Sequence, residues 1–119
     1  MTKKQLNPKE MAELACDALS DKKGSDILTI DIAEKTIIAD YFVICSGRSN
    51  TQVRALADHV DERFSKAGMQ PLRRDGYGED RWIVLDYGAI IVHIFHDETR
   101  LFYNLERLWD SGTNVKKVT

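Results

Sequence analysis

The stretch Trp82–Phe95, with the sequence WIVLDYGAIIVHIF, decides the fold of this chain. Two runs rich in β-branched and aromatic residues flank Asp86–Ala89, and Gly88 can supply the positive φ that a tight hairpin turn needs. Because side chains alternate along a strand, the first run has two different faces, formed by Trp82, Val84 and Asp86 and by Ile83, Leu85 and Tyr87. Both faces carry large apolar groups. We therefore expect another layer of the fold, a second subunit or a partner to cover the second face.

Composition limits the classes of protein that the chain can be. Its 119 residues, 43% hydrophobic and 30% charged, suit a single folded domain over residues 1–119. A net charge of −2 argues against a basic face for nucleic acid, so we expect no direct sequence-specific nucleic-acid binding. The chain has no apolar run long enough to span a membrane, and Met1–Gln5 does not resemble a signal peptide. We expect a cytoplasmic protein without membrane association, in which Cys16 and Cys45 are buried free thiols.

The first half of the chain predicts a helix followed by two strands. Asn7 can cap a helix whose first turn holds Pro8, and Gly24 ends it. A helical stripe recurs at Met11, Leu14, Ala15, Ala18 and Leu19. Residues 27–32 alternate as a strand, and 36–39 form a short apolar connection. The nearly continuous apolar run 41–45 predicts a central strand that is covered on both faces.

The second half predicts two more helices around the hairpin. Ser49 and Gln52 have the spacing of a capping box, and Gly68 ends the helix that they begin. The buried stripe of that helix is Val53, Leu56, Ala57, Val60 and Phe64. Residues 70–74 form a short strand and 75–80 a glycine-rich loop. A last helix starts at Asp97 with the stripe Phe102, Leu105, Leu108 and Trp109, and residues 113–119 form a loose tail. The order of elements predicts an α/β fold with a mixed β-sheet packed with helices, and leaves the strand order open.

One turn has the outline of an anion site. A strand, then the turn Ser46–Asn50, then a helix start is the arrangement that holds phosphate at helix N-termini, and Arg48 adds a positive charge. A strand-to-helix turn also favours Gly and Ser for conformational reasons alone, and this structural interpretation is the preferred one. Nucleotide binding at the turn is the alternative.

Other catalytic patterns are missing. No two acidic residues are spaced i, i+2, the spacing that a strand commonly uses to hold two metals for nucleotidyl transfer. No nucleophile elbow or paired cysteines occur, and His93 and His96 are three apart on a strand, so they should point to opposite faces. We expect satisfied or surface histidines and no metal or cofactor. Trp82 is either a core residue or an exposed anchor, to which Asp86 and Tyr87 could add a polar rim.

The chain as a whole resembles the ribosomal silencing factor (iojap-like) family, from about Leu6 to Trp109. The similarity lies in these segments: 40–47, 52–53, 57–58, 82–88, 92–95 and Arg100, Phe102–Tyr103, Leu105–Glu106 and Leu108–Trp109. It implies a nucleotidyltransferase-like fold that lacks the catalytic carboxylates, in agreement with the missing i, i+2 pair. It also implies a protein that is not an enzyme.

The resemblance implies a partner and a site as well. Members of the family bind the fourteenth protein of the large ribosomal subunit, block joining of the small subunit and repress translation when nutrients are scarce. The contact positions carried over to this chain are Trp82, Leu85, Asp86 and Tyr87. A homodimer is also expected. The alternative function is a small nucleotide-binding or nucleotidyltransferase-like enzyme that uses the Ser46–Asn50 turn.

Overall fold

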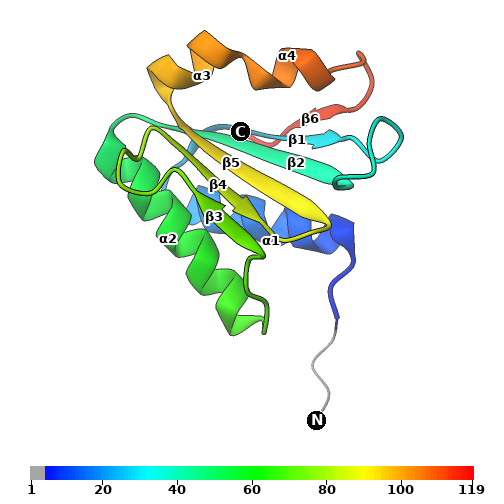
Figure 1. Cartoon of the computed structure of the whole chain (residues 1–119), viewed down its shortest axis with the longest axis horizontal. Coiled ribbons are helices and arrows are strands. Elements are labelled where there is room, and N and C mark those ends of the chain that lie inside the picture. Colours follow the sequence, from blue (N-terminus) through cyan, green and yellow to red (C-terminus); the bar gives the residue numbers. More distant parts are fainter. Residues whose placement is uncertain (1–4) are drawn as a thin grey trace.

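The computed structural model describes residues 5–119, which form a six-stranded sheet between two helical layers (Figure 1). The helices are α1 (Pro8–Asp21), α2 (Asn50–Lys66), α3 (Asp97–Tyr103) and α4 (Leu105–Trp109). The strands are β1 (Ser25–Asp31), β2 (Tyr41–Gly47), β3 (Arg73–Asp75), β4 (Trp82–Asp86), β5 (Ile90–His96) and β6 (Val115–Lys117). Their order is β3-β4-β5-β2-β1-β6, with β2 and β5 parallel and every other neighbouring pair antiparallel. The predicted mixed sheet packed with helices is therefore confirmed.

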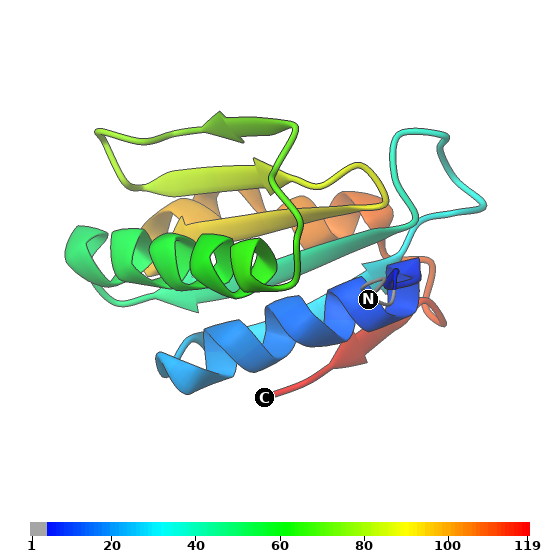
Figure 2. The same ribbon diagram turned by 90° about the horizontal axis from the view of Figure 1, so that it is seen from below.

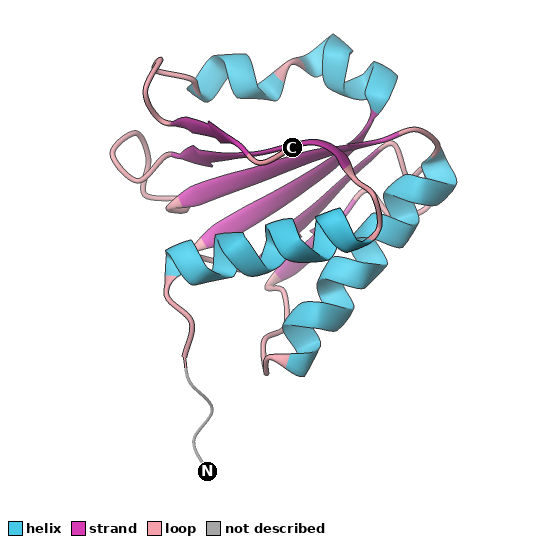
Figure 3. Cartoon of the chain, turned by 180° about the vertical axis from the view of Figure 1, so that it is seen from behind, coloured by secondary structure: helices cyan, strands magenta, loops and turns pink. Residues whose placement is uncertain are grey.

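The helices divide the core into two parts. α1 and α2 lie side by side on one face of the sheet, and α3 and α4 cross the opposite face (Figures 1, 2 and 3). Under the first pair lies the α1–α2 core, which includes Leu19, Val43, Leu56, Phe64 and Ile94. Under the second pair lies the smaller α3–α4 core, which includes Leu28, Ile30, Phe42, Ile44 and Phe95. β2 runs between β1 and β5 and is buried from Phe42 to Gly47, as its apolar sequence predicts.

The predicted start of α1 is confirmed, but its end differs in detail. Asn7 Oδ1 accepts from Glu10 N–H at 2.8 Å, and Glu10 Oε1 accepts from Asn7 N–H at 3.1 Å, which completes a capping box. The residue with left-handed backbone after the helix is Lys23 (φ 60°), not Gly24. Gly24 is instead required by packing, because a Cβ there would overlap Cys45 Sγ.

The hairpin has the predicted turn. Gly88 has φ +84°, and its N–H donates to Asp86 Oδ1 at 2.8 Å. In β4 the side chains alternate as the sequence indicates: Ile83 and Leu85 enter the α1–α2 core, whereas Trp82 and Val84 pack against the α3–α4 core. The second apolar face of the hairpin is thus covered, in part, by another layer of the same chain.

The prediction of a single last helix is wrong. Asn104 adopts left-handed backbone (φ 46°) and divides the segment into α3 and α4. As a result the expected stripe is not buried along one line: Leu105 and Trp109 are half-buried against the α3–α4 core, whereas Phe102 and Leu108 are exposed. Asn tolerates this conformation better than other non-glycine residues, so the break has a local cause.

The prediction of a loose tail at residues 113–119 is also wrong. Val115–Lys117 forms β6, which pairs antiparallel with β1 through Ile30↔Val115 and Leu28↔Lys117. Asn114 strengthens the approach to this strand, because its Nδ2 donates to the carbonyl oxygens of Asp31 and Trp109. Three residues are too few to show a strand pattern in the sequence, and the pairing comes from the available edge of β1.

Candidate functional site on the β4 side of the sheet

Trp82 is held on three sides but is not fully buried. Its indole stacks on Phe95 of β5 at 4.7 Å between ring centroids, and Tyr103 of α3 lies 5.0 Å from it. The indole N–H donates to Nδ1 of His93 at 3.1 Å. The sequence left open whether Trp82 is a core residue or an exposed anchor. The answer is intermediate: one part of the ring is packed, and the other part is open to solvent.

Trp82 belongs to a larger group, which we call the aromatic surface: Trp82 and Val84 of β4 together with Phe102 and Tyr103 of α3. Phe102 is 82% exposed and Tyr103 53% exposed, and their rings contact edge to face at 5.0 Å. A pocket of about 490 Å³ opens between them and the loop before β4, lined by Gly76, Glu79, Arg81, Trp82, Glu98, Thr99, Phe102 and Tyr103. Exposed aromatic groups around a pocket with a charged rim are typical of protein-binding surfaces.

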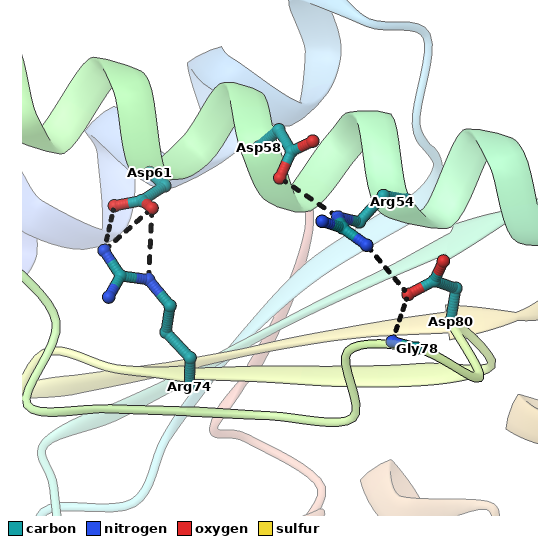
Figure 4. A network of polar contacts seen from close by, with 6 residues as sticks. All are labelled: Arg54, Asp58, Asp61, Arg74, Gly78 and Asp80. Carbon is teal, nitrogen blue, oxygen red and sulfur yellow. Dashed lines mark hydrogen bonds and ion pairs between the residues drawn. The ribbon is translucent and has the colours of Figure 1, made fainter.

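The loop that leads to Trp82 is tied to α2 by ion pairs (Figure 4). Arg74 of β3 makes a two-pronged contact with Asp61 of α2, the shorter bond being 2.9 Å. Arg54 of α2 lies 3.4 Å from Asp58 and 3.7 Å from Asp80, whose carboxylate accepts from Gly78 N–H. These contacts hold residues 74–80 against α2 and so fix where β4 begins.

Gly76 matters to the same loop for a steric reason. Its φ is +89°, and a Cβ at this position would overlap the carbonyl group of Trp82. The sequence indicated only a glycine-rich loop here. The structure gives this glycine a specific role, which is to let the loop pack directly on the first residue of β4.

The four contact positions carried over from the family do not share a face. Trp82 and Asp86 lie on the α3–α4 side of β4, where both are half-buried. Leu85 is fully buried in the α1–α2 core, and Tyr87 is 8% exposed on that same side. Leu85 therefore has no surface with which to touch a partner in this structure, and Tyr87 has almost none. In this structure both side chains support the hairpin from beneath, and a direct contact with a partner stays a prediction for all four positions.

Tyr87 is a packing residue with an unusual hydroxyl. Its ring stacks on Phe64 of α2 at 4.0 Å, with 19° between the ring planes. The hydroxyl oxygen is buried and has no hydrogen-bond partner within the described part of the chain. Burial raises the pKa of this phenol well above its ordinary value of 10, and Asp61 raises it further.

Several polar groups of the Ser46–Asn50 turn are bonded to other groups of the protein. Ser46 is 2% exposed, and its hydroxyl accepts from Arg100 at 2.8 Å. Gln52 accepts from Arg48 N–H at 2.7 Å and donates to the carbonyl of Lys23 at 3.2 Å, so it joins the start of α2 to the end of α1. Ser49 caps α2 by accepting from Gln52 N–H. The N–H groups of Arg48 and Gln52 are thus already bonded to side chains of the turn itself, which favours its structural interpretation.

The histidines have separate environments. His96 caps α3 by accepting from Glu98 N–H, and His59 lies 3.3 Å from Asp21. His93 is 7% exposed, and only one of its two nitrogens has a partner among the residues that the structure describes. Across residues 5–119, no three His, Cys, Asp or Glu side chains are grouped so as to hold a metal ion. None of the helices described here has the length and apolar character needed to cross a membrane.

Two features of the site could not be found in the sequence. The contact of Tyr103 with Trp82 depends on where α3 lies over the sheet, and the bond from Trp82 to His93 joins strands whose register is not fixed by sequence alone. The sequence holds one signal for the Trp82–His93 bond. In a short hairpin, alternation along the two strands places Val84 opposite His93, so Trp82, two residues before Val84, lies diagonally from that histidine.

Comparison with known proteins gives one consistent family. A family model described as "Ribosomal silencing factor during starvation" matches residues 5–119. The ribosomal silencing factor of Bacillus subtilis (strain 168) is 39% identical over 104 residues, which cover 87% of this chain and 88% of that protein. The one from Zymomonas mobilis is 42% identical over 107 residues, with 90% and 80% covered.

A solved structure agrees in fold over nearly the whole chain. The crystal structure of a protein from Chromobacterium violaceum superposes with a TM-score of 0.87 at 31% identity and covers 96% of this chain and 94% of that one. An iojap-related mitochondrial protein of Arabidopsis thaliana is 33% identical, with 82% of this chain and 56% of that protein covered. The chain therefore belongs to the ribosomal silencing factor family.

Proposed function

We propose that this protein binds the large ribosomal subunit, through its fourteenth ribosomal protein, and sterically blocks association with the small subunit. Translation would thereby be repressed under nutrient limitation. The observation that carries the proposal is the aromatic surface, which the fold leaves open beside a pocket in a chain that belongs to the silencing family. The proposed setting is the cytoplasm, and a homodimer remains a prediction.

The physical basis of binding would be the removal of aromatic area from water. Trp and Tyr contribute most per residue at protein interfaces because they combine large apolar rings with a polar group. Trp82 is already packed against Phe95 and Tyr103, so it would lose little side-chain freedom on docking. A rigid anchor of this kind favours tight binding without a covalent step.

The inhibition itself would require only that the bound protein occupies space that the small subunit needs. The described chain measures 45 × 32 × 24 Å, so a molecule seated on the joining face of the large subunit would exclude the small subunit from that place. The two would then compete for one surface. No nucleotide would be consumed, in keeping with a turn in which the Ser46 hydroxyl and the Arg48 N–H already have partners within the chain.

Subunit joining measured on sucrose gradients tests the steric mechanism. Purified protein in excess over ribosomes should lower the fraction of joined subunits, and raising the concentration of small subunits should restore it. Omission of nucleotide should change nothing. An inhibition that needs hydrolysable nucleotide, or one that small subunits cannot reverse, would instead support the enzyme-like alternative.

The surface is tested by Trp82→Ala in a co-sedimentation assay with purified large subunits. We expect a loss of about 2 kcal/mol in binding free energy, which is roughly a thirtyfold weaker Kd. Ile37→Ala is the matched control, because Ile37 is fully exposed on the β1–β2 loop and lies outside the aromatic surface. Equal losses in both variants would show that the aromatic surface is not the docking site.

A further inference from the structure

The orientation of Trp82 depends on one hydrogen bond across the hairpin. In the register of β4 and β5, Trp82 lies opposite Phe95 and Val84 lies opposite His93. The indole therefore stacks on its direct neighbour, Phe95, and reaches diagonally to His93, where its N–H donates to Nδ1 at 3.1 Å. Rings can slide and tilt in a stack, but a hydrogen bond fixes which edge of the indole points inward. His93 thus selects the edge of Trp82 that faces solvent.

This bond determines the tautomer of His93. Because Nδ1 accepts, the single ring hydrogen of neutral imidazole must lie on Nε2. Nε2 is buried and has no hydrogen-bond partner among the described residues. An unpaired donor of this kind usually destabilises a fold by about 1–3 kcal/mol, so it calls for a reason.

The surroundings of His93 offer no structural reason for a histidine. Its ring contacts Phe42 of β2 edge to face at 4.8 Å, and Trp82 and Phe95 lie 5.9 and 6.2 Å away. The neighbours from β2 and β4 are aromatic or aliphatic: Phe42, Ile44, Trp82 and Val84. A phenylalanine would suit such a site at least as well. What a phenylalanine could not do is accept the indole N–H.

We propose that His93 is a positioning residue: by accepting the N–H of Trp82 it holds the indole in the orientation that docks on the large ribosomal subunit. This inference rests on the proposed function for its readout in binding, but the bond itself can be tested alone. The role requires neutral imidazole, because a protonated ring would present a donor to the indole donor. Burial lowers the pKa of His93 to about 4, and no charged neighbour contributes, so the acceptor is present throughout the neutral range.

The binding test uses His93→Phe and purified large subunits. This change keeps a ring of similar size, removes the orphan donor and deletes the acceptor. We expect the protein to stay folded, with an unchanged or higher Tm, while its Kd for large subunits rises about tenfold. His93→Asn is the conservative variant, because its Oδ1 can take the place of Nδ1, and it should recover most of the affinity.

A double-mutant cycle separates positioning from direct contact. In a Trp82→Phe background no indole N–H remains, so adding His93→Phe should change the Kd by less than twofold. A full tenfold effect in that background would overturn the proposal, since His93 would then act without Trp82. So would a His93→Phe protein that binds as tightly as the natural chain while Trp82→Ala does not bind, an outcome that leaves the proposed function standing.

A spectroscopic test needs no ribosome and covers the case in which His93→Phe does not fold. In a Trp109→Phe background Trp82 is the single fluorophore of its kind. Its emission should shift reversibly with a midpoint near pH 4, before far-UV circular dichroism changes, as Nδ1 gains a proton. Emission that stays constant until the protein unfolds would overturn the bond and the proposal together. If the bond is confirmed but the natural chain does not co-sediment with large subunits, the proposed function fails by itself.

Discussion

The two faces of the β4–β5 hairpin are built from the same kinds of residue but are buried to different extents. On the α1–α2 side, Ile83, Leu85 and Val92 have no exposed surface and lie beneath two long helices. On the other side, Trp82 and Val84 are only half-covered, because α3 and α4 are short and α3 lies over β5 and β2. The difference shows that strand alternation, not apolar character, decides which of these residues can meet a partner.

The two faces also limit which of the positions carried over from the family can contact a partner directly. Four neighbouring positions were expected to contact the ribosome, but adjacent residues in a strand point in opposite directions. Leu85 and Tyr87 belong to the packed face, and Trp82 belongs to the open one. A buried position such as Leu85 would then affect binding without touching the partner, by fixing the strand that carries Trp82, the proposed contact residue.

The sharpest way to separate the two faces is Leu85→Ala. Removal of a fully buried leucine leaves a cavity in the α1–α2 core, so the free energy of unfolding should fall by about 2–5 kcal/mol. Urea denaturation followed by circular dichroism measures it. A Leu85→Ala protein that kept its stability but lost large-subunit binding would show that Leu85 is a contact residue after all.

A second test uses pH, and it concerns His93 on the α3–α4 side of the hairpin. The pKa of His93 falls from its ordinary value of 6.5 to about 4 in the folded chain, so only the unfolded chain binds this proton between those values. The contribution of neutral His93 to the free energy of unfolding is fully present above pH 6.5. It should be lost on acidification toward pH 4, and the loss is on the order of 1–3 kcal/mol.

Urea titrations at several pH values give that dependence. His93→Phe should have a flatter profile over the same interval, because the variant has no group to titrate at this position. An identical slope in both proteins would assign the pH dependence to other residues.

Ser49→Ala tests the α1–α2 side of the sheet at a place away from the hairpin, the start of α2. Loss of the hydroxyl that accepts from Gln52 N–H should lower stability by about 1 kcal/mol. Co-sedimentation with large subunits should be unaffected, because the turn is structural. A Mg²⁺-dependent nucleotide affinity that this variant abolished would contradict that interpretation.

The smallest expected effect comes from Tyr87→Phe. The change deletes a buried hydroxyl without a partner in residues 5–119 and leaves the stacked ring on Phe64. Stability should stay the same or rise by less than about 1 kcal/mol, and binding should not change. Thermal unfolding and co-sedimentation check both, and a marked loss of binding would return Tyr87 to the contact surface.

The sequence predicted what depends on local pattern. Caps at Asn7 and Ser49, the turn at Gly88 and the buried central strand all follow from spacings of a few residues, and the structure confirms each. What it could not predict depends on distant partners. β6, for example, exists because β1 has an open edge with which it can pair. The helix break at Asn104 has a local cause, the left-handed backbone of one residue, but a single asparagine in the sequence does not by itself predict it.

The site divides along the same line. Residue type and the resemblance to a family name Trp82 and Tyr87 as contact positions, and this stays a prediction. Which of them is open to solvent could not be inferred, because this depends on how far α3 reaches over the sheet. The bond from Trp82 to His93 was missed for the same reason, since it requires the register of two strands and the ring positions around them.

The late position of β6 has a consequence for synthesis of the chain. β1 is made early, yet its outer neighbour comes more than 80 residues later, at Val115–Lys117. A nascent chain released before Gly112 would carry an unprotected strand edge, which is a template for aggregation. Premature termination near the end of the message should therefore yield insoluble protein, although almost every core residue would already have been made.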